Sequence, residues 1–401
     1  MTQLSLDALR EAALPGGPNA LSFVTQLEPA AGPHSLVAPA KYSTRGGPTY
    51  VFEDRYIDGR FRRTVLLDSR SSNGNRLEEA LNDARRSGHP LYSRIPGIVV
   101  RYASDDDTEV VLWDTELPHR FSDAHIRLSS ISGEPTTQHP DYRAARNATP
   151  GDARALFEIS PLSVLFGCWD STRRAKQARF PAAVVGETIG VITDTEGATS
   201  EPTRRSGARI DPVGASVQLD ASTAADLART QAGEMSEKKI RSISKQKGTV
   251  STSNLGLGAI PPGVEDLDGI ATTEIIRSQV VSFATLRRLR FGHAPDGDAA
   301  IRTLLAALTV AAITRSGADL YLRANCHLVE SGPTTGRLDR RSGQVEELDG
   351  LTVDAADAIV AEALADAEGV AGLDWRGQVL EVVGNPEVLR GALSDEAAEE
   401  G

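Results

Sequence analysis

The chain has 401 residues, of which 40% are hydrophobic and 24% are charged. This composition can bury a core and excludes a chain that is disordered throughout. The longest aliphatic run, residues 304–313, has about half the length of a membrane-spanning helix, and the first residues lack the apolar core of a secretory signal. The two cysteines, Cys168 and Cys326, exclude a disulfide framework and a cysteine-rich zinc site. We therefore expect a soluble, cytoplasmic protein without a membrane partner.

The net charge of −12 is unevenly distributed. Residues 331–401 hold 16 Asp and Glu against five Arg and no Lys, so the rest of the chain is nearly neutral. Four of the six lysines fall within 238–247, and further basic clusters lie in 41–76, 173–179 and 277–290. Local positive patches of this kind set the affinity of a protein for a phosphate backbone. Each cluster could instead be a solvated loop or helix face.

The first half of the chain predicts an N-terminal extension followed by alternating strands and helices. Residues 1–30 form the expected extension, with a helix over 5–13 that ends at the Pro-Gly-Gly-Pro sequence of 15–18. Strands are expected over 35–43, 49–59 and 62–69, with the last two on either side of an Asp58-Gly59 turn. A helix is expected over 76–86, and 97–102 and 109–114 should form a hairpin.

The second half predicts a sheet that is covered by helices on one side. Residues 195–265 are rich in Gly, Ser and Thr and are interpreted as a long insertion that forms a core poorly. A helix over 299–315 ends before Gly317, and a strand over 319–330 alternates apolar and polar side chains. A further amphipathic helix is expected over 353–371. Helices on one face of a mostly antiparallel sheet indicate an α+β fold.

The segment between the strand over 62–69 and the next helix is a candidate phosphate site. Asn75 and Glu78 have the spacing of a capping box, so the helix is expected to begin near Arg76. Hydroxyls, amides and free backbone N–H groups at a helix start suit a phosphate, and Arg70 and Arg76 add positive charge. The spacing of a P-loop is absent. A plain capped turn is the alternative.

Two other segments contain residues of types that can support chemistry. His119, Asp123 and His125 have a spacing that suggests a metal site, but no further ligand completes the shell, so we expect no metal. His119 is a possible general acid or base without a partnered carboxylate. Trp169 stands next to basic residues, which suits stacking with phosphate contacts, although it could equally be a core residue.

Ordered sequence blocks resemble a known family. The blocks LLDSRSSNGNRLEEAL, PHRFSDAHIRLSSISG, PLSVLFGCWDSTRRAKQARFP, GARIDPVG, SNLGLGAIPPG, LRRLRFG and GADLYLRANCHLV are similar to the backbone RAMP subunit of type I-G (formerly I-U) CRISPR Cascade. The resemblance covers residues 35–330. The family more often has glutamines and an alanine where this chain has Arg70, Ser72, Asn73 and Gly74.

The resemblance implies a right-hand shape with an RRM/ferredoxin-like palm, finger insertions and a protruding thumb. It places palm and fingers within 31–330 and the thumb at about 235–262. Residues 331–401 lie outside the resemblance and are expected to form an acidic, partly helical segment. Copies would stack head to tail along the CRISPR RNA and present it to target DNA. Other partners would be the large subunit and the fused repeat-processing and cap subunit of the complex. The family's backbone subunit is not the nuclease, so no catalytic residue, cofactor or metal is expected.

A guide must be held regardless of its sequence, so contacts to phosphates and 2′-hydroxyls are expected. The predicted RNA-binding residues are Lys41, Arg45, Ser69, Arg70, Ser71, Asn73, Asn75, Arg76, His119, Arg120, Trp169, Arg173, Arg174, Lys176, Arg209, Lys245 and Lys247. Leu255, Leu257 and Ile260 are candidates for a wedge between bases. The main alternative is a RAMP endoribonuclease that processes the repeat RNA with His119 as acid or base. A small-molecule α+β enzyme is a third possibility.

Overall fold

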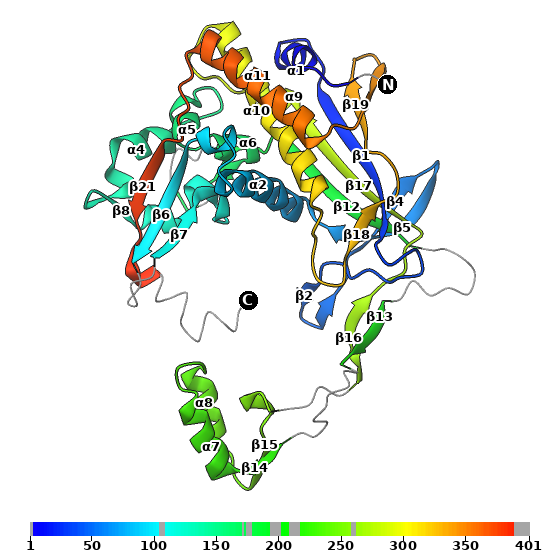
Figure 1. Cartoon of the computed structure of the whole chain (residues 1–401), viewed down its shortest axis with the longest axis vertical. Helices are drawn as coiled ribbons and strands as arrows, with labels where there is room; N and C mark the ends of the chain where they lie inside the picture. The colour runs from blue at the N-terminus through cyan, green and yellow to red at the C-terminus, as the bar shows by residue number, and fades with distance from the viewer. Residues whose placement is uncertain are drawn as a thin grey trace. The chain divides into compact units, whose positions relative to one another are not determined.

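The computed structural model describes residues 3–103, 109–170, 172–173, 179–192, 202–207, 217–257 and 262–388. The chain divides into two compact units (Figure 1). Unit 1 comprises Met1–Ser200 and Ile270–Asn385, and unit 2 comprises Glu201–Gly269 and Pro386–Gly401. Antiparallel sheets and packed helices make the fold α+β, as the sequence predicted.

The central sheet of unit 1 has ferredoxin-like connectivity. The chain runs β1 (Ala20–Pro29), α2 (Arg70–Arg86), β12 (Val184–Val191), β17 (Glu274–Ser282), α10 (Pro295–Ala318) and β19 (Thr335–Asp339). These strands lie in the order β19-β1-β17-β12, and every pairing is antiparallel. This βαββαβ arrangement is the palm-like fold that the sequence predicted.

Additional strands widen this sheet at both edges. β5 (Arg60–Asp68) and β4 (Phe52–Ile57) follow β12, and β20 (Val345–Asp349) follows β19. The expected hairpin around the Asp58-Gly59 turn is thereby confirmed. The assignment of residues 1–30 to an extension is corrected, because β1 is an internal strand that pairs with both β17 and β19. The alternating burial of β1 explains its position inside the sheet, since Leu21, Phe23 and Leu27 point into the core.

Helices cover one face of the palm. α10 is buried over most of its length and packs beside α11 (Val353–Ala371), which has the bounds that the sequence predicted (Figure 1). α10 is long and apolar enough to cross a membrane, but 94% of its apolar window is buried inside the protein, as in a core helix. The expected end of this helix before Gly317 is corrected. Gly317 lies within α10, and a side chain there would start 3.1 Å from the Arg277 guanidinium.

The other face of the three central strands carries small, mostly uncharged side chains. β1 contributes Ser22 and Val24, and their partners on β17 are Val280 and Ser278. β12 adds Val185 and Glu187. None of these residues is aromatic, so this part of the described sheet lacks the base-stacking platform of an RRM.

Two predicted strands are absent or shorter in the described structure. Of 319–330, only β18 (Leu328–Glu330) is a strand, because a turn with Asn325 at a φ of 60° joins Arg323 to Cys326. The alternation of apolar and polar residues in 319–330 therefore belongs mostly to a turn that packs against the palm, not to a strand. Of 35–43, only the end enters a strand, β2 (Tyr42–Thr44), which pairs with β3 (Gly47–Thr49).

A second sheet in unit 1 has the order β7-β6-β21-β8-β9. β6 (Gly97–Ala103) and β7 (Glu109–Trp113) confirm the predicted hairpin, and β21 (Val379–Val383) lies parallel to β6. The acidic segment 331–401 thus supplies strands to both sheets and the helix α11. The remaining elements of unit 1 are α1 (Leu6–Ala13), α3 (Ala124–Arg127), β8 (Ser130–Ile131), β9 (Glu134–Pro135), α4 (Pro140–Arg146), α5 (Arg154–Ile159), α6 (Pro161–Phe166), β10 (Cys168–Trp169), β11 (Arg179–Phe180) and α9 (Phe283–Leu286).

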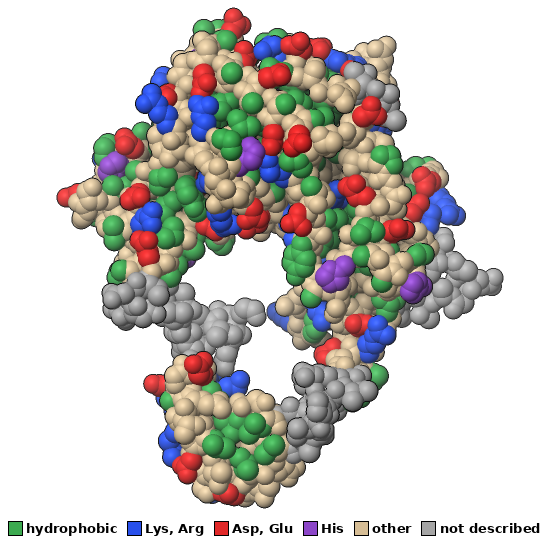
Figure 2. All heavy atoms as spheres, in the orientation of Figure 1, with side chains coloured by type: hydrophobic (Ala, Val, Ile, Leu, Met, Phe, Trp, Pro, Cys, Tyr) green, Lys and Arg blue, Asp and Glu red, His purple; other side chains and the backbone are tan. Residues whose placement is uncertain are grey.

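In its described residues, unit 2 contains two antiparallel strand pairs, β13 with β16 and β14 with β15, and two α-helices. Its elements are β13 (Thr203–Ser206), β14 (Gln218–Asp220), α7 (Ala221–Thr230), α8 (Glu237–Ser244), β15 (Thr249–Ser251) and β16 (Gly263–Gly269). Ala224, Ala228, Ile243 and Leu255 form a small core, which corrects the expectation that this segment forms a core poorly. Figure 2 shows hydrophobic side chains gathered on the visible face of this unit.

Candidate nucleic-acid interface

The start of α2 lies earlier in the chain than the sequence predicted. α2 begins at Arg70, and its N-cap is Ser69, whose Oγ accepts a hydrogen bond of 3.3 Å from the Ser72 N–H. Asn75, the predicted N-cap, is an exposed residue within the helix. The first turn of α2 contains no acidic residue, so the partial positive charge of the helix N-terminus is uncompensated by its own side chains.

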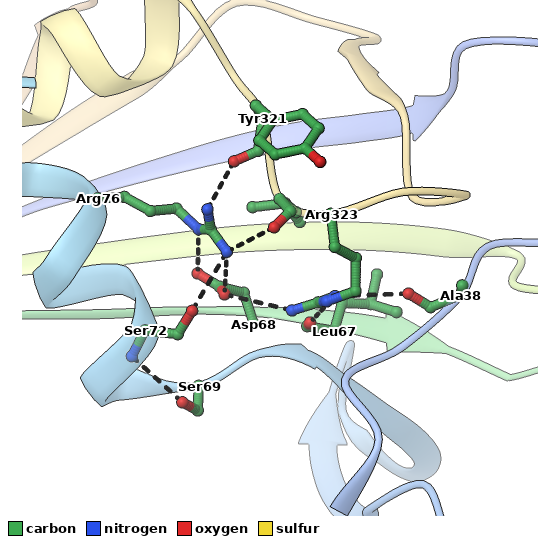
Figure 3. Close-up of polar contacts among 9 residues, drawn as sticks. Ala38, Leu67, Asp68, Ser69, Ser72, Arg76, Tyr321 and Arg323 are labelled. Carbon is green, nitrogen blue, oxygen red and sulfur yellow. Dashed lines mark hydrogen bonds and ion pairs between the residues drawn. The ribbon is translucent and has the colours of Figure 1, made fainter. Parts of the chain in front are cut away.

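Two arginines fix the start of α2 to the rest of the palm. Arg76 Nε and Nη2 donate to the two carboxylate oxygens of Asp68 at 3.3 and 3.2 Å, and Arg76 Nη1 donates to the Tyr321 carbonyl at 2.7 Å (Figure 3). Arg323 reaches the same carboxylate at 3.6 Å and donates to the Leu67 carbonyl at 2.6 Å. Asp68 is fully buried. Arg76 is therefore a positioning residue for the helix, which corrects its assignment as an RNA contact.

Exposed polar residues around this helix start form what we call the α2 surface, which comprises Lys41, Arg70, Ser71 and Asn75. Arg45 is also exposed, but it lies in the turn between β2 and β3. Arg323 also donates to the Ala38 carbonyl, at 3.4 Å, which holds the chain just before Lys41 beside the end of β5. Lys41 and Arg45 form no ion pair with any described residue. Asn73 is not part of the α2 surface, because its side chain points into the core and is only 3% exposed.

One carboxylate moderates the charge near the α2 surface. Glu187 on β12 accepts hydrogen bonds from Arg55 at 2.5 and 3.3 Å, and Arg70 Nε lies 3.4 Å from it. The hydrogen bonds from Arg55 lower the pKa of Glu187, and the charge of Arg70 acts in the same direction. The Arg70 side chain remains 69% exposed, so its outer nitrogens stay accessible to a ligand.

His119 and Arg120 have different surroundings although they are adjacent. His119 is exposed, and its backbone N–H donates to Asp123. Arg120 forms a two-point ion pair with the buried Glu78 and donates to the Gly167 carbonyl at 2.9 Å. Arg120 is therefore not available to RNA, which corrects its assignment. Among the residues that the structure describes, no three His, Cys, Asp or Glu side chains are grouped to hold a metal ion.

The predicted cluster around Trp169 is partly described. Trp169 is 42% exposed, and the Arg179 guanidinium lies over its ring at 4.0 Å from the centroid. Arg173 donates to the Arg146 carbonyl at 2.5 Å and to the Asn147 side chain at 2.6 Å. Arg173 thus holds a neighbouring loop. The predicted contacts Arg174, Lys176 and Arg209 lie outside the described residues.

In unit 2 the predicted lysine contacts are exposed, whereas the predicted wedge residues differ from one another in exposure. Lys245 and Lys247 follow α8 and are exposed. Leu255 is 8% exposed and belongs to the small core, so it is not available as a wedge, which corrects that assignment. Leu257 is 42% exposed and remains a candidate, and Ile260 lies outside the described residues.

Sequence reasoning missed an exposed aromatic pair. Tyr56 and Phe61 lie opposite each other on β4 and β5, with their rings edge to face at 5.5 Å and exposures of 69% and 76%. The Asp58-Gly59 turn was recognised, and counting residues outward from it would have paired these two rings.

Part of the chain matches a known protein family. Residues 21–194 match the family model of CRISPR-associated protein GSU0053, and they include β1, the α2 surface and Trp169. No curated protein matches the chain at a significant level. The matched residues make up less than half of the chain, and the match supports a CRISPR-associated protein.

Proposed function

We propose that this protein binds CRISPR RNA without cleaving it, and that copies of it repeat head to tail along the guide in a type I-G surveillance complex. The observation that carries the proposal is the α2 surface. There, a helix N-terminus whose first turn has no acidic residue stands next to a serine hydroxyl and to exposed cations. Such a surface recognises the ribose-phosphate backbone and carries no information about base sequence.

The open face of the palm supports the same function. Its described residues on β1, β12 and β17 offer no aromatic platform on which bases would stack. A guide held by its backbone keeps its base edges free to pair with target DNA. The match to a CRISPR-associated family covers the residues of the α2 surface.

Unit 2 supplies features that suit the role of a thumb. Lys245 and Lys247 are exposed cations, and Leu257 is an exposed apolar side chain in the same unit. Lysines that contact phosphates and an aliphatic side chain that separates bases would together displace one nucleotide of a bound strand. The proposed partners beyond the guide and target DNA are further copies of the chain and the large and repeat-processing subunits of a cytoplasmic complex.

The test is equilibrium binding of unstructured RNA strands that have equal length and different sequence. The double variant Lys245→Ala/Lys247→Ala should weaken binding equally for all strands and flatten the dependence of log K on log salt by about 0.7 per lost contact. The charge-conserving control Lys245→Arg/Lys247→Arg should retain the wild-type salt dependence. Effects that vary strongly with strand sequence, or no affinity for RNA at moderate salt, would contradict the proposal.

A further inference from the structure

A cavity of about 430 Å³ lies beside Trp169 in unit 1. Its volume is in the range of pockets that hold small molecules, about 300–1,000 Å³. Apolar walls come from Trp169, Phe180, Pro181 and Leu289, and the exposed Arg179 and Arg288 line the same cavity. Aromatic and apolar walls together with two cations suit a flat, uncharged ring that is joined to a negatively charged group.

The walls of this cavity are held in place by the surrounding backbone. Trp169 and Arg179 pair across the β10–β11 hairpin, which keeps the guanidinium over the indole. The hairpin begins at Gly167, which has a φ of 84°, and a Cβ there would lie 2.6 Å from the Phe180 carbonyl oxygen. Arg120 donates to the Gly167 carbonyl, so the buried Glu78–Arg120 pair also positions the hairpin.

The opposite wall is equally fixed. Arg302 donates two hydrogen bonds, of 3.0 and 2.8 Å, to the Leu289 carbonyl. The Arg290 N–H donates to the Pro150 carbonyl at 2.9 Å, which joins the two loops that line the cavity. Phe180 and Leu289 are 5% and 3% exposed. The cavity therefore exists before a ligand arrives, which lowers the entropic cost of binding.

The charges at the cavity are available to a ligand. Arg287 and Arg290, the neighbours of Arg288, donate to backbone carbonyls. In the described parts of the chain, neither Arg288 nor Arg179 forms an ion pair with a carboxylate. Two guanidiniums without carboxylate partners next to an exposed indole provide a phosphate contact and a stacking surface in one place.

We propose that this cavity binds one unpaired nucleobase of a single-stranded RNA, with the base against Trp169 and the adjoining phosphate at Arg288. The inference rests on the proposed RNA binding. It adds a site that distinguishes a nucleotide with its base from an abasic one. The match to a CRISPR-associated family, which includes Trp169, Arg179 and Phe180, favours RNA over an acidic peptide as the occupant. Arg179 has two roles here, since it orients the indole and adds positive charge.

The experiment is a titration of intrinsic tryptophan fluorescence with two oligouridine strands, one intact and one in which abasic sugars replace the nucleosides. Trp169 is the most exposed of the three tryptophans, because Trp375 is buried and Trp113 is half-buried with Arg85 4.3 Å from its ring. The intact strand should quench the fluorescence and bind about tenfold more tightly than the abasic strand. Both strands have the same phosphates, so the difference isolates the base.

Three variants make the test specific. Trp169→Ala should bind both strands equally, about tenfold more weakly than the wild type binds the intact strand. Trp169→Phe keeps an aromatic ring, so it should retain most of the preference for the intact strand and lose the fluorescence signal. Arg288→Ala should flatten the salt dependence for both strands by about 0.7. Thermal unfolding of each variant checks that it is folded.

The outcomes separate this inference from the proposed function. If Trp169→Ala and Trp169→Phe bind like the wild type, or if the wild type does not distinguish the two strands, the base site is refuted while the thumb lysines still report on RNA binding. If the wild type binds neither strand, both proposals fail. Quenching of the fluorescence by an Asp- and Phe-containing peptide but not by the intact RNA would assign the cavity to a protein partner and overturn the base site.

Discussion

Arg76 donates hydrogen bonds to both carboxylate oxygens of Asp68, a residue with no exposed surface. The same guanidinium reaches the carbonyls of Tyr321 and Leu322, so it links the first turns of α2 to a segment 245 residues away in the sequence (Figure 3). Arg70, at the start of the same helix, is mostly exposed. Two arginines that look equivalent in the sequence therefore have opposite roles.

Arg76→Ala should destabilise the protein by about 3 kcal/mol, because it leaves a buried carboxylate that, among the described residues, has only the more distant Arg323 as an ionic partner. Chemical denaturation monitored by circular dichroism measures this loss. The matched control is Arg70→Ala, which should change the stability by less than about 0.5 kcal/mol. Equal stability losses in the two variants would contradict the positioning role of Arg76.

For RNA affinity the ranking of the two variants should be reversed, so that Arg70→Ala has the larger effect. Arg70→Ala should weaken binding by about 1 kcal/mol, or fivefold, at moderate salt, because it removes a contact to the backbone. Fluorescence anisotropy with a labelled RNA strand measures the change, and Arg70→Lys should restore part of it. If Arg70→Ala binds RNA like the wild type, the α2 surface does not contact the strand.

Glu187→Gln should strengthen RNA binding and steepen its salt dependence, since Arg55 and Arg70 lose the carboxylate that they share. Binding isotherms at several salt concentrations show the effect. Glu187→Asp keeps the charge and serves as the control. Unchanged binding in Glu187→Gln would mean that this cluster lies away from the RNA.

The same carboxylate predicts a pH dependence of stability. The pKa of Glu187 is lowered by its hydrogen bonds with Arg55, so its contribution is fully present above the ordinary value of 4.5 and is lost as the pH falls through the lowered value. Denaturation midpoints at neutral pH and at about pH 3 should therefore differ more in the wild type than in Glu187→Gln, because the neutral amide does not titrate. Equal differences would remove Glu187 as the cause.

Leu255→Ala should destabilise unit 2 by about 2 kcal/mol, because the side chain fills a core of few residues. Limited proteolysis of unit 2 measures this local loss. Leu257→Ala is the control, since Leu257 is exposed and its removal should leave proteolysis unchanged. If Leu257→Ala is cleaved as fast as Leu255→Ala, then Leu257 also packs in the core and cannot separate bases.

Purified protein incubated with repeat RNA in the absence of metal should yield no discrete product. His119 is exposed, and its environment supplies a backbone contact to Asp123 rather than a partnered base. Denaturing gel electrophoresis resolves the products. A single cleavage site that disappears in His119→Ala would instead establish the endoribonuclease alternative.

Local patterns alone determined several elements of this protein. The helix over 353–371 and the hairpin around Asp58-Gly59 were predicted because side-chain periodicity and turn chemistry act between residues that are close in the sequence. The α+β class followed from the order of these elements. The position of β1 inside the sheet does not follow from the sequence, because its pairing partners lie about 250 residues or more further along the chain.

Tertiary structure alone decided which charged side chains remain free. Composition and spacing placed Arg70, Arg76 and Arg120 together as cations for RNA. Folding pairs Arg76 with Asp68 and Arg120 with Glu78, and only Arg70 keeps an accessible guanidinium. Whether a cation faces solvent or a buried carboxylate depends on contacts between distant segments, which no local pattern encodes. For the same reason, the cavity beside Trp169 is a product of the tertiary structure, because β10, β11 and the loop after α9 line it together.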